Sequence, residues 1–152
     1  MRVFPFVLLA SLLALMGCSG VTSSSGSDPV ADSQKLQGTW KLTGATYDGD
    51  SISEDVRWTF DGDQISVTVH GTEEKSHFRL GTGGPNTIWV KHHDNPLVGQ
   101  RFFGGTLTGI YELSGDRLRV CYDLTGRQYP KRFEAWKGSR QVVYELAREG
   151  AR

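Results

Sequence analysis

Short segments in which apolar and polar residues alternate recur along the chain from residue 38 to residue 148. In "VRWTF" (56–60), Val56, Trp58 and Phe60 share one face, and "QISVTVH" (64–70) alternates in the same way. A period of two with β-branched and aromatic residues predicts β-strands. The "DGD" between these segments predicts a tight hairpin, because Asp-Gly is a strong signal for a two-residue turn.

The same pattern predicts six further strands, and the first of them is expected to bend near Gly44 because glycine weakens a strand interior. They cover 38–47, 76–80, 87–90, 106–113, 117–123 and 141–148. No long helix is expected, and "DSQKLQ" (32–37) is compatible with one helical turn. Eight short antiparallel strands with regular turns predict a closed barrel or a sandwich, which periodicity does not separate. A barrel of eight strands is either filled by side chains or holds one small ligand.

The first residues of the chain have the pattern of an export signal. Met1 and Arg2 precede an apolar segment that ends at Gly17 and is shorter than the roughly 20 residues that span a bilayer. "LMGC" (15–18) resembles a bacterial lipobox, which implies cleavage before Cys18 and a diacylglycerol on its thiol. The alternative is an ordinary signal peptide with an incidental cysteine, and the Ser/Gly-rich stretch that follows favours the lipobox.

These features divide the chain into a signal peptide (1–17), a lipidated Cys18 with a flexible linker (18–34) and one domain (35–152). Ser and Gly make a linker that does not bury enough surface to fold. Acyl chains such as palmitate, attached in pairs, give stable membrane anchoring. We therefore expect a protein of the cell envelope whose partner is a membrane, and Ser19 favours the outer membrane, facing the periplasm.

The composition argues against a nucleic-acid partner and against stabilisation by an internal disulfide. Lys and Arg together number 17, as do Asp and Glu, so the chain shows no basic footprint for a nucleic acid. Once Cys18 is lipidated, Cys121 has no partner for an internal disulfide, and stability must come from packing. The sequence leaves the oligomeric state open.

Three segments carry a resemblance to a known family: "LQGTWKL" (36–42), "GIYELSGDRLRVCYD" (109–123) and "YPKRFEAWKGSRQVVYELARE" (129–149). Together they resemble the lipocalin-like domain family common in planctomycetes. The resemblance implies an all-β fold, an eight-stranded antiparallel up-and-down barrel of the calycin type, and no established activity. The chain departs from the family at Tyr129-Pro130, where Arg-Pro is usual, and it is least similar over 84–106.

A structural pair follows from the resemblance. Strand parity places Arg148 on the same face as the apolar Tyr144 and Leu146. In lipocalin-like barrels an arginine of the last strand packs over the tryptophan of the first strand and closes the base. This implies that Arg148 packs over Trp40, a contact worth on the order of 1–2 kcal/mol when desolvated. The alternative is that Arg148 simply emerges at the end of its strand.

No set of residues predicts a catalytic or metal centre. His70 and His77 flank "GTEEKS", which would let them face each other, but a zinc site needs three or four ligands. His92-His93-Asp94 is compatible with a turn around a metal and equally with a solvated loop. Asp61 and Asp63 are better explained as turn formers than as an acid-base pair. The chain has no Gly-x-Ser-x-Gly elbow, and no Lys-Ser/Thr follows its glycine runs. We expect no enzyme, no metal and no cofactor.

Two other features have alternative interpretations. Cys121 lies on the strand face of Arg119, so it is either an exposed thiol with a lowered pKa or a small half-buried hydrophobe, and we favour the second. Phe102 and Phe103 precede a Gly-Gly pair. They are candidates for a lid at a ligand-binding mouth of the barrel, or for one core and one edge residue.

The leading hypothesis is a non-catalytic binding module for a small apolar or amphipathic ligand. The alternative is a structural or protein-interaction domain of the envelope, with a filled barrel and no ligand. The barrel interior separates the two, because a carrier needs a lined cavity of about 300 Å³ or more. An interior packed around Trp40, Trp58 and Phe60 would argue against carriage inside the barrel.

Overall fold

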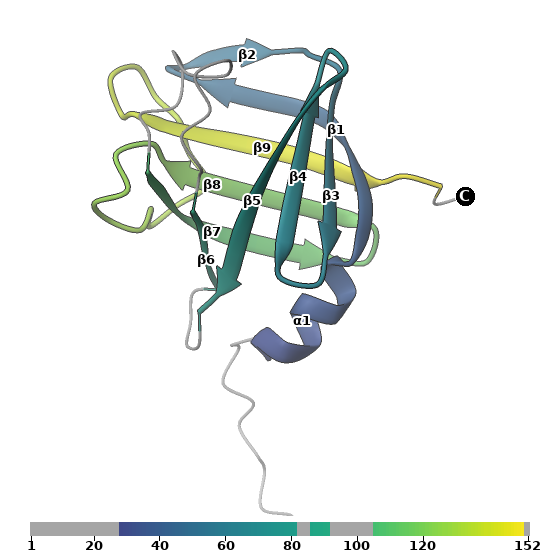
Figure 1. The fold of residues 1–152 in the computed structure, drawn as a ribbon. Helices are drawn as coiled ribbons and strands as arrows, with labels where there is room; N and C mark the ends of the chain where they lie inside the picture. Colours follow the sequence, from purple (N-terminus) through teal and green to yellow (C-terminus); the bar gives the residue numbers. More distant parts are fainter. Residues whose placement is uncertain (1–27, 82–85, 92–104, 151–152) are drawn as a thin grey trace, which may run out of the picture.

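The computed structural model describes residues 28–81, 86–91 and 105–150. One helix, α1 (Pro29–Leu36), precedes the strands (Figure 1). These are β1 (Gly38–Tyr47), β2 (Asp50–Ile52), β3 (Val56–Asp61), β4 (Gln64–Val69), β5 (Thr72–Leu80), β6 (Thr87–Lys91), β7 (Thr106–Ser114), β8 (Arg117–Asp123) and β9 (Gln141–Arg148). None of the described helices is long and apolar enough to cross a membrane.

The strands form one antiparallel sheet that closes on itself. Neighbours pair in the order β1-β3-β4-β5-β6-β7-β8-β9, and β9 pairs back with β1 from Trp40↔Arg148 to Tyr47↔Val142. This closure confirms the predicted eight-stranded up-and-down barrel, and the alternative prediction of a sandwich is wrong. All eight expected strands are present. The additional β2 pairs only with the second half of β1, through Ala45↔Ile52, and its three residues are too few to show a period.

The helix begins earlier in the chain than expected. α1 runs from Pro29, inside the segment 18–34 that its composition predicts to be a flexible linker. Asp28 caps the helix, because its Oδ1 accepts a hydrogen bond of 3.0 Å from the backbone N–H of Val30, and proline suits the first helical position. The folded part of the chain therefore starts before the predicted boundary at Lys35, because these local capping residues outweigh the polar composition around them.

The helix is docked against one end of the barrel by its polar and apolar side chains together (Figure 1). Leu36 is fully buried, and its carbonyl accepts a hydrogen bond of 2.8 Å from Nε1 of Trp40. Asp32 is 3% exposed, and its Oδ2 accepts a hydrogen bond of 2.8 Å from Oη of Tyr111. Nζ of Lys35 lies 3.6 Å from the other carboxylate oxygen. α1 thus closes the base of the barrel.

Replacing Tyr111 by phenylalanine is expected to lower the free energy of unfolding by about 1–3 kcal/mol, because it removes a hydrogen bond from the buried carboxylate of Asp32. Urea denaturation measures the change. The control is Tyr129→Phe, since Tyr129 is 45% exposed and its removal leaves no buried group unpaired. Equal stabilities of the two variants would contradict the role assigned to the Tyr111–Asp32 bond.

Part of the barrel interior is closely packed with aromatic and aliphatic side chains, whereas Val67, Val69 and Tyr144 on the same face are only partly buried. Trp40, Trp58 and Phe60 are 0%, 3% and 2% exposed. The ring centroids of Trp58 and Tyr144 are 5.1 Å apart, and those of Trp58 and Tyr122 are 6.1 Å apart. Around Trp40, Trp58 and Phe60 the described side chains therefore leave no room for a ligand, which is the packing expected for the alternative hypothesis.

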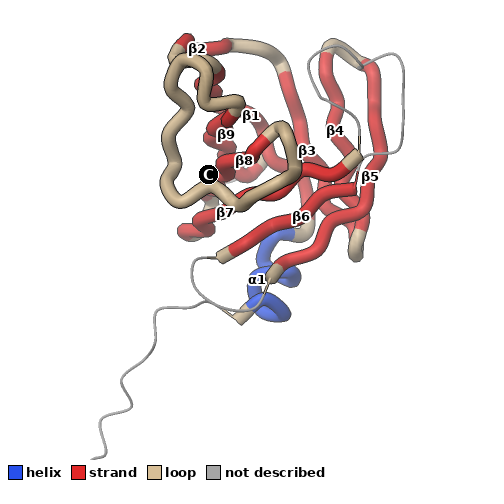
Figure 2. The backbone as a smooth tube through the Cα atoms, turned by 90° about the vertical axis from the view of Figure 1, so that its left-hand side faces the viewer, coloured by secondary structure: helices blue, strands red, loops and turns tan. Residues whose placement is uncertain are grey.

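A second, smaller core lies on the outside of the barrel wall. The loop of residues 124–140 connects β8 to β9 and runs beside β1 and β2, where it is drawn in tan in Figure 2. Ala135 on this loop packs with Ile110, Cys121 and Val143 of the wall. The backbone N–H of Gly49 donates a 2.8 Å hydrogen bond to the carbonyl of Ala135, so the β1–β2 hairpin holds the loop.

Candidate functional site

The structure brings Arg148 and Trp40 together. Cζ of Arg148 lies 4.2 Å from the ring centroid of Trp40. Its Nη1 donates a hydrogen bond of 2.8 Å to the carbonyl of Gln37, its Nη2 donates to the carbonyl of Lys35, and its Nε lies 3.1 Å from Oδ1 of Asp116. These contacts join β9, the end of α1 and the β7–β8 turn. The pair therefore connects three elements at the base of the barrel.

Several predicted site residues lie outside the described part of the chain. These are the lipidation candidate Cys18, the possible mouth residues Phe102 and Phe103, and the segment His92-His93-Asp94. The hypotheses on lipidation, on the lid and on the second histidine cluster stay predictions.

The other histidines do not face each other as their spacing allowed. His70 is at the tip of a tight hairpin and has a φ of 48°, followed by Gly71 with a φ of 83°. β5 begins at once with Thr72 opposite Val69, so only Gly71 of "GTEEKS" belongs to the turn and the other five residues are strand. His77 lies opposite Gln64, with its Nδ1 3.3 Å from Oδ2 of Asp63. In residues 28–81, 86–91 and 105–150, no three His, Cys, Asp or Glu side chains gather as a metal site would require.

The two aspartates of the "DGD" segment form a turn, as expected. Asp61, the last residue of β3, pairs with Gln64, the first residue of β4. Gly62, which lies between Asp61 and Asp63, has a φ of 61°. A two-residue hairpin turn requires a positive φ at this position, and glycine adopts it readily. Asp63 contacts His77 and does not pair with Asp61 for acid-base chemistry.

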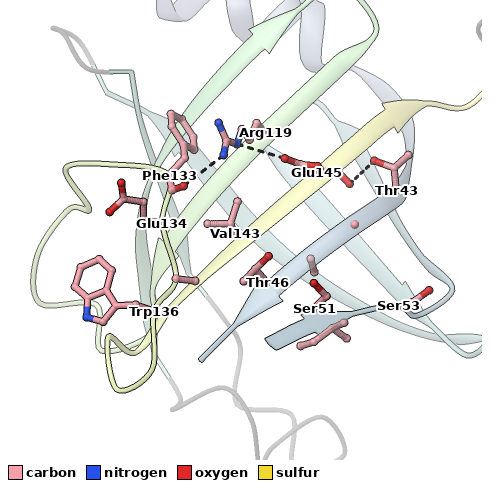
Figure 3. A pocket seen from close by; sticks show the side chains of 14 residues that line it. Thr43, Thr46, Ser51, Ser53, Arg119, Phe133, Glu134, Trp136, Val143 and Glu145 are labelled. Carbon is pink, nitrogen blue, oxygen red and sulfur yellow. Dashed lines mark hydrogen bonds and ion pairs between the residues drawn. The ribbon is translucent and has the colours of Figure 1, made fainter. Parts of the chain in front are cut away.

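A groove of about 700 Å³ lies on the outer wall of the barrel (Figure 3). Its floor is formed by the outer faces of β1, β2 and β9, and the segment Phe133–Trp136 of the long loop forms one wall. The described lining contains three ionisable side chains, Arg119, Glu134 and Glu145, together with Thr and Ser hydroxyls and apolar groups.

Cross-strand register explains the shape and chemistry of the floor. One row runs across β9, β1 and β2 through Val143↔Thr46↔Ser51. The next row runs through Arg119↔Glu145↔Gly44 and ends in a residue without a side chain. A Cβ at Gly44 would lie 3.7 Å from Oε2 of Glu145, an ordinary contact. The floor is therefore hollow at Gly44 because this position of the row is a glycine.

Arg119 is held in a fixed position over the loop (Figure 3). Its Cζ lies 4.9 Å from the ring centroid of Phe133, and its Nη2 donates a 3.4 Å hydrogen bond to the carbonyl of the same residue. Its Nε lies 3.6 Å from Oε1 of Glu145, an ion pair longer than a hydrogen bond. This Nε is buried without a hydrogen-bond partner among the described residues. The unpaired Nε is thus enclosed, and the rest of the partly exposed Arg119 side chain faces solvent beside the Glu145 carboxylate.

Cys121 is buried beneath the loop and is not the exposed thiol of the alternative interpretation. Its exposure is 0%, and its Sγ donates a long hydrogen bond of 3.8 Å to the carbonyl of Glu134. Burial raises the pKa of the Cys121 thiol from 9.0 to about 11. The nearby guanidinium of Arg119 opposes this rise without cancelling it.

In its folded state, the Cys18→Ala variant is expected to resist alkylation of Cys121 at pH 8, because the Cys121 thiol is buried and protonated. In 8 M urea the same thiol should react at least a hundredfold faster. Since the folded-state pKa exceeds the unfolded-state value, the thiol favours folding below about pH 9, and this contribution is lost as the pH rises to about 11. Equal alkylation rates in the native and unfolded states would contradict the burial.

Among the described residues, one side-chain polar atom inside the barrel is buried without a hydrogen-bond partner. Oη of Tyr122 is buried and has no hydrogen-bond partner among the described residues. Burial raises the pKa of Tyr122 and that of the neighbouring Tyr144, whose ring centroid lies 6.3 Å away. Both phenols are therefore neutral, and a neutral buried hydroxyl without a partner is unusual in a core.

Comparisons with known proteins identify similar folds. No protein-family model matches the chain, and no curated protein matches it. Two solved structures are similar. A lipocalin-like protein from Bacteroides uniformis shares 18% identity over 74% of this chain and 97% of its own, with a TM-score of 0.48. An uncharacterized protein from Bacteroides eggerthii shares 15% identity over 74% and 98%, with a TM-score of 0.49.

The groove was not predicted from the sequence. Strand parity places Arg119 on the outer face, but only the fold shows that Phe133 and Glu134 lie beside it. The arrangement combines hydrogen-bond donors, acceptors and apolar surface at one open site. Such a site is suited to non-covalent binding, since small-molecule sites join a largely apolar lining with a few placed polar groups.

Proposed function

We propose that the protein is a non-catalytic binding module of the bacterial cell envelope, held to a membrane by lipid on Cys18. The outer-wall groove, and not the centre of the barrel, receives a small amphipathic ligand. The observation that carries this proposal is the contrast between the close packing around Trp40, Trp58 and Phe60 and the groove of about 700 Å³. Its volume lies within the range of about 300–1,000 Å³ typical of ligand sites.

The lining of the groove supports an amphipathic ligand. Trp136 and the partly buried Phe133 supply the exposed apolar surface of the lining, whereas Ala45 and Val143 are buried beneath it. Arg119 donates and Glu145 accepts hydrogen bonds at adjacent positions of one cross-strand row. A ligand with an apolar body and one group that both donates and accepts hydrogen bonds, such as an amide, matches both features.

Filling the floor of the groove tests this site. We expect the full-length protein to bind 4-phenylbutyramide, a neutral amide with an apolar body, and Gly44→Val to weaken that binding at least tenfold. The substitution is compatible with the fold, because a Cβ at Gly44 meets only the flexible end of Glu145. The control is Ser66→Val on β4, outside the groove lining. Equal affinities of the two variants, measured by calorimetry, would reject the groove as the site.

The membrane anchor is tested separately. Cys18→Ala is expected to abolish metabolic labelling with palmitate and to release the protein from the membrane fraction. Cys121→Ala is the matched control, since Cys121 is buried in the folded domain and is not a lipid acceptor. Continued labelling of the Cys18→Ala variant would reject the lipoprotein assignment while leaving the groove proposal unaffected.

A second candidate site is the barrel interior, as the leading sequence hypothesis had it. The unpartnered Oη of Tyr122 favours it, because a ligand acceptor would satisfy this hydroxyl. Trp58 packs 6.1 Å from Tyr122, between ring centroids, so a ligand there would change the environment of Trp58. The two candidate sites therefore have different tryptophan reporters, Trp58 inside the barrel and Trp136 at the groove.

A further inference from the structure

We infer that the ligand of the outer-wall groove is a neutral saccharide, an inference that rests on the proposed function of this groove. The charges of the lining are the first step. Its ionisable side chains are one guanidinium, Arg119, and two carboxylates, Glu134 and Glu145. An anion would meet the carboxylates and a cation would meet the guanidinium, so a neutral ligand with both donors and acceptors fits best.

The hydroxyl groups along the groove are the second step. Thr46, Ser51 and Ser53 line it, and within the described residues none of their hydroxyls has a protein hydrogen-bond partner. Thr43 differs, because its hydroxyl donates a 2.9 Å hydrogen bond to the carbonyl of Glu145. Each hydroxyl both donates and accepts, as sugar hydroxyls do. A hydrocarbon chain laid on this floor would leave these groups without partners.

An exposed aromatic side chain at the rim is the third step. Trp136 lines the groove and is 56% exposed, the largest aromatic side chain left in solvent among the described residues. Its backbone carbonyl accepts a hydrogen bond of 3.0 Å from the backbone N–H of Ser139, which fixes the turn that carries it. Figure 3 shows the indole ring extending from the loop away from Thr46 and Ser51. An exposed indole offers a large flat apolar surface. Pyranose rings present a matching apolar face of C–H groups beside their hydroxyls.

The test is calorimetric titration of the full-length protein with three neutral hexasaccharides: cellohexaose, maltohexaose and mannohexaose. We expect at least one to bind, with Trp136→Ala weakening its affinity at least tenfold and Gly44→Val doing the same. The matched control is Tyr129→Ala. Tyr129 is on the same loop and 45% exposed but does not line the groove, so this variant should keep its affinity within twofold.

The outcomes separate this inference from the proposed function. Binding of 4-phenylbutyramide in a Gly44-dependent way, without binding of any hexasaccharide, overturns the saccharide inference and leaves the groove proposal standing. Failure of both classes of probe overturns both. Saccharide binding that is unchanged in Trp136→Ala and Gly44→Val also overturns the inference. Capture of an extended hexapeptide along β2 in place of the saccharides would assign the groove to peptides instead.

Discussion

Replacing Trp40 by alanine is expected to lower the free energy of unfolding by about 3–5 kcal/mol, the usual cost of removing a large buried aromatic side chain. Trp40 is fully buried at the base of the barrel. The change also removes the hydrogen bond to the carbonyl of Leu36 and the surface on which Arg148 stacks. Denaturant unfolding followed by circular dichroism measures the loss.

The matched control is Trp136→Ala, since Trp136 is 56% exposed and should cost less than about 0.5 kcal/mol. A double-mutant cycle with Arg148→Ala isolates the stacking contribution, which we expect at about 1–2 kcal/mol. If the Trp40 and Trp136 variants were equally stable, the account of the closed base would be wrong.

Gly109→Ala is expected to destabilise the fold by about 3 kcal/mol or more, because overpacking a wall that cannot yield is costly. A Cβ at this position would lie 2.6 Å from Cδ1 of Tyr122 and 2.7 Å from the carbonyl oxygen of Cys121. The backbone oxygen belongs to the paired strand β8 and is not free to move. The ring of Tyr122 therefore occupies the space that the missing side chain leaves.

Gly44→Ala is the control for this prediction, because its Cβ would meet only a flexible carboxylate at 3.7 Å. We expect it to change the free energy of unfolding by less than about 1 kcal/mol. Thermal unfolding of the two variants measures the difference. Similar midpoints would show that Tyr122 is able to leave the wall, which would imply a looser interior than the structure shows.

The strands were predictable because their buried residues alternate. Val56, Trp58 and Phe60 point inward from β3, and the hairpin at Gly62 follows the local Asp-Gly signal. β5 was predicted only from Ser76 onwards, because its first residues are polar on both faces and look like a loop. The start of α1 was missed for a similar reason, since a Ser-rich and Asp-rich composition concealed a helix cap at Asp28.

The groove depends on long-range features that local patterns do not contain. Arg119, Glu145 and Gly44 form one row only because β9 pairs with both β8 and β1. The register also shifts between Leu42 and Gly44, which alters which residues of β1 share a row with β9. The contact between Trp40 and Arg148 could be predicted from the sequence only through the family resemblance.

The most direct test of the outer-wall site is ¹⁹F NMR of the full-length protein labelled with 5-fluorotryptophan and titrated with 4-phenylbutyramide. The chain has four tryptophans, so each gives one resonance that a Trp→Phe variant assigns. We predict that the Trp136 resonance shifts while that of Trp58, buried beside Tyr122, does not. A shift of the Trp58 resonance with an unchanged Trp136 resonance would place the ligand inside the barrel and contradict the account.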